Sequence, residues 1–487
     1  MGVSPSAISR VTGVEVTYKN FNAGKAQKLP QRLVVIGPAN DNSVFDFSKK
    51  ELSAASDVAK IYGYGCPLHL AAEQLLPSNG KTAEFPVSFI GLSKKNGAAA
   101  AEGGIGATGN ATGNGSGKVS IGGISVEFAV KKADTADVVL ANIKSAIDSV
   151  LNMPVTTGTI EDGELPLTAK WSGALGNRIS LEIESNVPGI IFAPTLFNSG
   201  ALDPDISPAL EKIGTVWETI ILNCFDYTDT DRLDIYQLFA EGRGGVLEKK
   251  PLYIAHGCAD DLVTRTAITN LRENDFSNFL IVSVGSRELP FVIAAKGLID
   301  DIMTTANKNP AQNYKGRLTG LHCGADDVQE NYTDRNSSIT KGSSNNIKTG
   351  NVAELNDIVT FYHPAAEGKY PAKRYLVDLI KLQNVVYNVR LIMEADELKG
   401  APLVTDATIT TNPTAVSPKT IKTMFFNLAD SLALAAIIQE PKFTKENMTV
   451  AIDGENPKRV NVVFPVKLSG NVEVFSTDVY FGFYLGE

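Results

Sequence analysis

Residues 458–487 read KRVNVVFPVKLSGNVEVFSTDVYFGFYLGE. From Val460 to Leu468 the apolar side chains fall on every second residue, which is typical of a β-strand with one buried face. After a turn at residues 469–471, the run Val472–Leu485 is rich in valine and aromatic residues, which favour strands. A terminal strand exposes an edge unless another strand pairs with it. Either this run folds back into its own domain, or another copy of the chain supplies the partner, and the rest of the sequence favours the second alternative.

Residues 1–28 are expected to form a second terminal arm. Apolar residues at 14, 16 and 18 alternate with polar ones, which predicts one short strand with no hairpin partner beside it. Candidate subunit-linking strands therefore lie at both ends of the chain. The side chains assigned to them are Val14, Val16, Tyr18, Val474, Phe475, Val479, Phe481 and Phe483.

The composition is that of a soluble globular protein of several domains. The chain has 487 residues, 43% of them hydrophobic and 20% charged, and a formal net charge of −9. No block of Lys and Arg is present, so a nucleic-acid or anionic-membrane partner is not expected. The longest apolar run, Leu432–Ile438, is too short to span a bilayer, and the N-terminus has no secretory signal pattern.

Two segments, 29–95 and 201–350, alternate between strand and helix patterns. The compact apolar run Leu33–Gly37 is typical of a buried strand. Further strands are predicted at 87–90, 219–223, 252–256 and 279–284, with helices between them. This alternation predicts one α/β domain with a largely parallel, doubly wound sheet, interrupted by an insertion.

The insertion, residues 96–200, is expected to be a β-rich domain. Its first part, Asn96–Gly123, is rich in Gly and Ala without apolar periodicity, which predicts a flexible linker or long loop. Gly104–Gly109 matches the dinucleotide fingerprint in letters, but it lacks the preceding strand and following helix that a pyrophosphate needs, so no cofactor is predicted. A hairpin at Gly122-Gly123 and a helix over 134–151 follow.

Residues 351–470 predict an α+β domain with antiparallel strands. A long helix is expected over 371–394. A second helix begins at Ser417-Pro418, where a cap residue precedes proline at the first helical position. The strand 448–452 turns at Asp453-Gly454 into the strand quoted above, and residues 471–487 form the C-terminal arm.

The sequence contains no convincing catalytic, cofactor or metal site. It lacks a nucleophile elbow and a phosphate-binding loop. Its Cys–His pairs match no zinc spacing, and they are expected to supply small buried thiols. The aspartates near 226–234 fit helix capping, by Asp229 or Asp231, better than a calcium loop. One alternative stays open: His256 and Cys258 at a strand end could form a nucleophile pair, and convergence with Asp260 around a pocket would favour it.

The order of these parts resembles contractile tail sheath proteins, especially those of Mu-like myophages. The likeness covers nearly the whole chain. It rests on residues 29–37, on the helices of 55–76 with their break at 61–65, on AKWSGALGN at 169–177, and on the helix, helix, three-strand order of the C-terminal domain.

The resemblance implies a structural protein, not an enzyme. Sheath subunits stack as hexameric rings around an inner tail tube, and their terminal arms add strands to the C-terminal domains of neighbouring copies. Contraction, triggered at the baseplate, drives the tube into the target envelope. The implied partners are further copies of the chain, the tube protein, and baseplate and tail terminator proteins. The implied location is the virion tail, assembled in the bacterial host cytoplasm, with the inserted domain facing outward.

Two other classes remain as alternatives. The first is a doubly wound α/β enzyme with a site near His256 and Cys258. The second is a secreted or surface adhesin with a β-rich insertion, against which the absence of a signal pattern and of a disulfide framework speaks.

Overall fold

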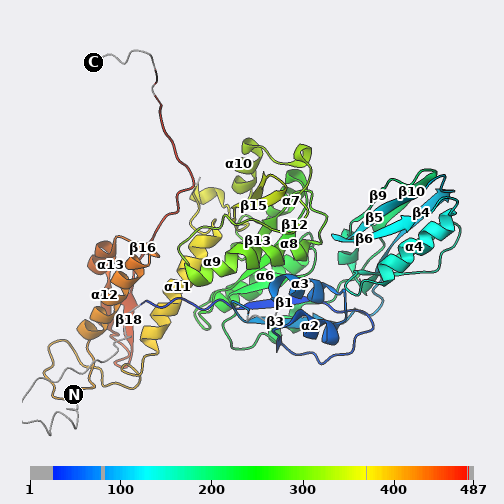
Figure 1. Ribbon diagram of the computed structural model, residues 1–487. Coiled ribbons are helices and arrows are strands. Elements are labelled where there is room, and N and C mark those ends of the chain that lie inside the picture. The colour runs from blue at the N-terminus through cyan, green and yellow to red at the C-terminus, as the bar shows by residue number, and fades with distance from the viewer. Residues whose placement is uncertain (1–25, 78–82, 369, 480, 482–487) are drawn as a thin grey trace, which may run out of the picture. The chain divides into compact units, whose positions relative to one another are not determined.

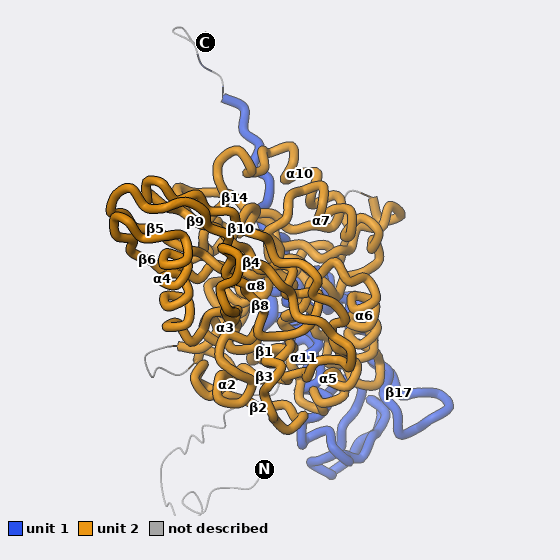
Figure 2. The backbone as a smooth tube through the Cα atoms, turned by 90° about the vertical axis from the view of Figure 1, so that its right-hand side faces the viewer, with its two compact units in different colours: residues 1–29, 310–313, 380–487 blue, residues 30–309, 314–379 orange. Residues whose placement is uncertain are grey.

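The computed structural model describes residues 26–77, 83–368, 370–479 and 481. The chain forms two compact units, coloured separately in Figure 2. We call residues 30–309 and 314–379 the α/β unit, and residues 1–29, 310–313 and 380–487 the C-terminal unit. Within the described residues, no helix combines the length and apolar character that crossing a membrane requires.

A six-stranded sheet organises the α/β unit, with strand order β13-β12-β11-β1-β3-β2. Its strands are β1 (Leu33–Pro38), β2 (Lys50–Glu51), β3 (Val87–Leu92), β11 (Ile220–Asn223), β12 (Tyr253–Cys258) and β13 (Asn278–Val282). All neighbours pair in parallel except β2, which runs antiparallel to β3. The predicted doubly wound sheet is confirmed, and β1, β3, β11, β12 and β13 are buried along their whole length, as strands covered on both faces must be.

Helices cover both faces of this sheet (Figure 1). On one face, α5 (Ser207–Glu211) and α6 (Thr230–Gly244) pack in one core cluster with Val34, Ile36 and Ile254. On the other face, α3 (Pro67–Leu75) and α8 (Pro290–Gly297) approach the strands. The approach of α8 requires Gly257, because a Cβ there would overlap the Pro290 carbonyl.

The remaining elements of the body connect and flank these layers. They are α2 (Ala55–Tyr62), α7 (Leu262–Thr269), a π-turn (Leu298–Ile302) leading into α9 (Met303–Lys308), α10 (Tyr332–Thr340), and the hairpin of β14 (Asn345–Thr349) and β15 (Val352–Asp357).

The insertion contains two antiparallel sheets and one helix. The four-stranded sheet has the order β10-β4-β8-β7 and the three-stranded sheet β6-β5-β9. The elements are β4 (Ala100–Gly109), β5 (Gly115–Ile121), β6 (Ile124–Val130), α4 (Ala136–Asp148), β7 (Val155–Thr157), β8 (Glu164–Ser172), β9 (Leu181–Ser185) and β10 (Ile190–Asn198). The β5–β6 hairpin turns at Gly122 and Gly123 with φ of 56° and 86°, as predicted.

The prediction of a flexible linker or loop over 96–123 is wrong, because β4 and β5 lie there. β4 pairs with β8 and β10, and β5 with β6 and β9. The glycines make room for neighbours instead of loosening the chain: a Cβ on Gly103 would overlap the Thr195 carbonyl of β10, and one on Gly117 the Phe128 ring. The fingerprint-like Gly104–Gly109 is thus part of an antiparallel strand.

The C-terminal unit is built on helices and short antiparallel ladders. Its elements are α11 (Leu376–Met393, from residue 380 onward), α12 (Pro418–Leu434), β16 (Ile438–Gln439), α13 (Pro441–Asn447), β17 (Thr449–Ile452), β18 (Val460–Val463) and β19 (Lys467–Leu468). The predicted cap is confirmed, since Ser417 accepts a hydrogen bond from the Thr420 amide. The single strand expected over 460–468 is two strands, β18 and β19, separated around Pro465, which has no N–H to donate to a ladder.

Candidate functional site

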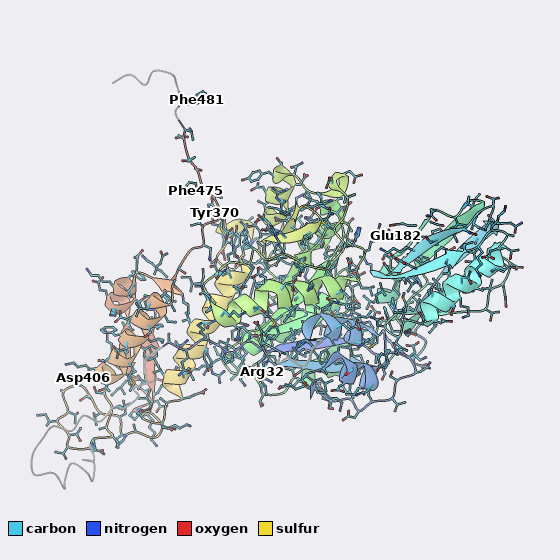
Figure 3. The ribbon with its side chains drawn as sticks, viewed as in Figure 1. Arg32, Glu182, Tyr370, Asp406, Phe475 and Phe481 are labelled. Atoms are coloured by element: carbon cyan, nitrogen blue, oxygen red, sulfur yellow. The ribbon has the colours of Figure 1, made fainter. Side chains whose placement is uncertain are left out.

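The C-terminal segment, residues 472–479 and 481, carries apolar side chains that are exposed. It forms no strand within the described part of the chain. Its predicted linking side chains are exposed: Val474 is 75% exposed, Phe475 85%, Val479 76% and Phe481 93%. Figure 3 labels Phe475 and Phe481 along this segment. An aromatic and β-branched segment with this exposure is suited to pairing with a strand from elsewhere.

The other side chains assigned to the linking strands lie outside the described residues. These are Val14, Val16, Tyr18 and Phe483. Their role in subunit linking stays a prediction.

The β17–β18 ladder provides edges to which a strand can be added. Thr449 pairs with Val463 and Ile452 with Val460 in antiparallel register. Among the described residues neither strand has a second ladder partner. The sheet packs its Val450, Val460 and Val462 side chains on the α12 cluster, so one face is covered, while neither edge pairs with a further strand of the described residues.

The crevice at the carboxyl ends of the parallel strands, where doubly wound folds bind ligands, holds an arginine of the insertion. Arg178 ends the 3₁₀ turn Ala174–Arg178. Its Nε lies 2.5 Å from Asp226 Oδ2, and its Nη1 lies 2.9 Å from Asp260 Oδ1. The Tyr227 hydroxyl donates to the other oxygen of Asp260. The cavity left beside these groups has about 130 Å³, which is below the range of small-molecule sites.

His256 and Cys258 do not form a nucleophile–base pair. The His256 ring is fully buried, with Nδ1 3.0 Å from Asn223 Nδ2 and Nε2 2.9 Å from Asn278 Oδ1. Burial lowers the pKa of His256 to about 4, so the ring is neutral and both nitrogens are occupied by amides. Burial also raises the pKa of the Cys258 thiol to about 12, which keeps it protonated and a poor nucleophile. Asp260 is engaged with Arg178 instead of converging with them.

The remaining polar candidates have structural roles. Asp229 is the N-cap of α6 and accepts a hydrogen bond from the Arg232 amide, which confirms the capping interpretation. Cys66 likewise caps α3, and the Nδ1 of His69 accepts from the Gly65 amide. In the described ranges no three Cys, His, Asp or Glu side chains are grouped so that they could hold a metal ion.

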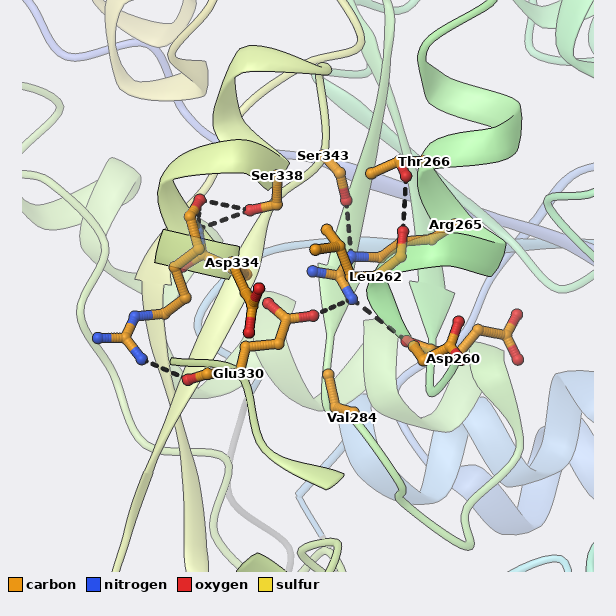
Figure 4. Close-up of polar contacts among 12 residues, drawn as sticks. Asp260, Leu262, Arg265, Thr266, Val284, Glu330, Asp334, Ser338 and Ser343 are labelled. Atoms are coloured by element: carbon orange, nitrogen blue, oxygen red, sulfur yellow. Dashed lines mark hydrogen bonds and ion pairs between the residues drawn. The ribbon is translucent and has the colours of Figure 1, made fainter. Parts of the chain in front are cut away.

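A buried ion pair in the α/β unit was missed by sequence reasoning. Arg265 of α7 is fully buried; its guanidinium contacts Glu330, its Nε donates to Ser343 Oγ at 2.8 Å, and its Nη1 donates to the Asp260 carbonyl (Figure 4). These contacts tie α7 to the segments on either side of α10. Nothing in the local pattern distinguishes Arg265 from a solvated helix residue, because its partners lie far away in the sequence.

Comparisons with known proteins show similarity to tail sheath proteins. No family model matches the chain. The chain is 24% identical, over 99% of its length and 100% of the relative, to the Mu-like prophage FluMu tail sheath protein of Haemophilus influenzae. The resemblance to the tail sheath protein of a Mu-like prophage is thereby confirmed over nearly the whole chain.

Solved structures of low sequence identity also align with most of the chain. A sheath tail protein of Listeria innocua aligns with a TM-score of 0.49 and 11% identity over 92% of this chain and 94% of the other. One of Desulfitobacterium hafniense aligns with 0.47 and 11% over 90% and 93%. The contracted helical sheath of the anti-feeding prophage aligns with 0.47 and 10% over 98% and 99%.

Proposed function

We propose that this relative of tail sheath proteins is the structural subunit of a contractile sheath. Its copies stack as hexameric rings around an inner tube, and contraction of the stack drives the tube through the envelope of a target cell. Residues 30–95 and 201–379 form the body of the subunit, 96–200 an outer domain, and 380–470 the assembly domain; the boundary predicted at 351 moves, because the β14–β15 hairpin belongs to the α/β unit. Residues 1–28 and 471–487 are arms that link neighbouring copies.

The exposed C-terminal segment is the observation that carries this proposal. In a single chain the apolar side chains of this segment contribute almost no burial free energy, because Phe475 and Phe481 are almost fully exposed to water. Strand addition would give their backbone a ladder partner and bury alternate side chains, which is a common mode of peptide recognition. The open edges of β17 and β18, in the same C-terminal unit, supply the complementary surface in a second copy.

The proposed partners follow from this assembly. They are further copies of the chain, the inner tail tube protein, and the baseplate and tail terminator proteins at the two ends. The subunit would reside in the virion tail, or in the sheath of a related contractile particle, after assembly in the host cytoplasm.

The enzyme alternative receives less support. Its two candidate residues, His256 and Cys258, are buried and unreactive in their present environment. At the carboxyl ends of β11 and β12, where these two residues would act, the crevice is taken by Arg178 of the insertion. These groups stabilise the fold, which is what a structural protein requires of them.

Removal of residues 1–20 tests the proposal directly. We expect a folded monomer that forms no tubes, because an exchanged strand is not needed for the subunit's own core. The substitution Val16→Pro should weaken assembly similarly, since proline removes a ladder donor. Ile409→Pro, at a fully exposed position outside the strands, is the matched control. Negative-stain microscopy and sedimentation measure the outcome, and tubes of normal length and stability from the truncated protein would refute the arm exchange.

A further inference from the structure

Helix α11 carries a row of buried polar side chains. Lys381, Asn384 and Asn388 are spaced three and four residues apart, so they lie on one face of the helix. Their exposures are 0%, 0% and 2%. Burying an ammonium and two amides is costly unless they are hydrogen-bonded, and each of them bonds to the chain close to one of the termini.

The two asparagines hold the base of the N-terminal segment. Asn388 Oδ1 accepts a hydrogen bond from the Gln27 amide at 2.6 Å, and its Nδ2 donates to the Gln27 carbonyl at 2.8 Å. Asn384 Oδ1 accepts from the Leu29 amide at 2.8 Å. A single side-chain amide thus gives Gln27 the pair of bonds that a neighbouring strand would give.

The spacing of these contacts matches an extended chain. Four residues of an α-helix rise about 6 Å, and two residues of a strand rise about 6.6 Å. Asparagines at positions i and i+4 therefore meet backbone groups at alternate residues, 29 and 27. The amide of each asparagine also bonds a carbonyl of α11 one turn back, which orients the side chain toward the segment.

Lys381 holds the base of the C-terminal segment from the same helix. Its Nζ donates to the Ser469 carbonyl and to Asn471 Oδ1, both at 2.6 Å. The Nδ2 of Asn471 donates in turn to the Ala311 carbonyl at 2.9 Å. Asn313 of the same short loop donates to the Glu473 carboxylate.

We propose that Lys381, Asn384 and Asn388 form a common anchor for both terminal segments. The anchor recognises mostly main-chain groups, so it holds the bases of the segments without depending on their apolar side chains. The consequence for assembly rests on the proposed sheath function: the two connections of a subunit to its neighbours leave from one helix, and their spacing is set inside the C-terminal unit alone.

Hydrogen–deuterium exchange of the full chain, before any assembly, tests the anchor. In the double variant Asn384→Ala/Asn388→Ala we expect the amides of residues 27 and 29 to exchange at least about tenfold faster, because each loses the hydrogen bond that protects it. Peptides from α12 and from 469–473 should keep their protection. Asn427→Ala, at an exposed position of α12, is the control of the same type and should change nothing. Unchanged exchange at 27 and 29 would overturn the proposal.

Two further variants separate local release from failure to fold. Asn388→Leu keeps the branched shape of the side chain but removes both bonds to Gln27, and it should release residue 27 without lowering protection in α12. Lys381→Met should release 469–473 and leave 27–29 protected. Loss of protection throughout the C-terminal unit in both variants would show a general packing role and would contradict a segment-specific anchor.

The assembly readout distinguishes this inference from the sheath proposal. Anchor variants keep both arms, so we expect tubes to form but with subunit spacing more variable than in the parent, measured by electron microscopy. If no variant, including the parent, forms tubes, the sheath proposal fails while the exchange result still decides the anchor. If exchange is accelerated but the tubes stay as regular as those of the parent, the anchor does not set the spacing.

Discussion

Replacing Phe475 and Phe481 by serine should leave the free subunit folded and weaken its assembly strongly. Both rings are exposed in the single chain, at 85% and 93%, so their loss should change its unfolding free energy by no more than about 0.5 kcal/mol. In a paired strand each ring would become buried. Burial of one phenylalanine contributes roughly 1.5–3 kcal/mol, so the pair contributes roughly 3–6 kcal/mol to each strand exchange, as an upper limit.

This energy converts into a large change in association. A loss of roughly 3–6 kcal/mol lowers an association constant about a hundredfold to ten-thousandfold. The assay is the lowest protein concentration at which tubes sediment and are seen by negative stain, with thermal melting of the unassembled chain as the check on folding. Leu434→Ser, at a position 90% exposed on α12, is the matched control, and we expect it to leave both measurements unchanged.

Substitutions on the two faces of the proposed strand should have different effects on assembly. In a strand, Phe475, Val479 and Phe481 share one face and Val474 lies on the other. Val474→Ser should therefore raise the lowest protein concentration at which tubes form, but by less than either Phe475→Ser or Phe481→Ser does. Tubes that form from Phe475→Ser/Phe481→Ser at the concentration of the parent would refute the reasoning, because the apolar face would then contribute nothing.

Further predictions concern the joint of the insertion, salt, and pH. Arg178→Ala leaves Asp226 and Asp260 without their shared cation and should destabilise the α/β unit by about 2–4 kcal/mol, seen as a lower melting temperature and faster proteolysis of the insertion; an unchanged melt would contradict this. In the proposed sheath, contraction would exchange the contacts between subunit bodies, so tube formation by the bodies should depend on salt while arm pairing depends on it weakly, and salt-insensitive assembly of an arm-deleted chain would count against this. His256, whose pKa burial lowers to about 4, stays neutral in the fold while the unfolded chain takes up a proton below about 6.5, so stability falls by roughly 3 kcal/mol from pH 6.5 to 4. In His256→Gln the unfolding free energy, measured with denaturant at each pH, should fall less steeply between pH 6.5 and 4. An unchanged dependence on pH would show that His256 does not cause the loss.

The sequence alone determined those elements whose signal lies within a few neighbouring residues. The alternation after Val460 predicts β18, which packs on α12, but not the interruption before β19. Ser417-Pro418 predicts the start of α12, and Gly122-Gly123 predicts a hairpin turn. The succession of strands and helices predicts the doubly wound sheet. Backbone preference, capping and side-chain periodicity act over one or two turns of chain, so these patterns can be recognised without tertiary structure.

Only the tertiary structure shows which residues far apart in the sequence are in contact. The sequence predicts a flexible segment at the glycines of β4, yet these glycines admit the backbone of β10 and so belong to a sheet. Arg178 and Asp260 are 82 residues apart, and the asparagine Asn384 is 355 residues from Leu29. From the sequence alone, a polar residue is predicted to be exposed, because burying it without a partner costs free energy. Its burial can be stabilising once its hydrogen bonds are satisfied, and only the tertiary structure shows the partner.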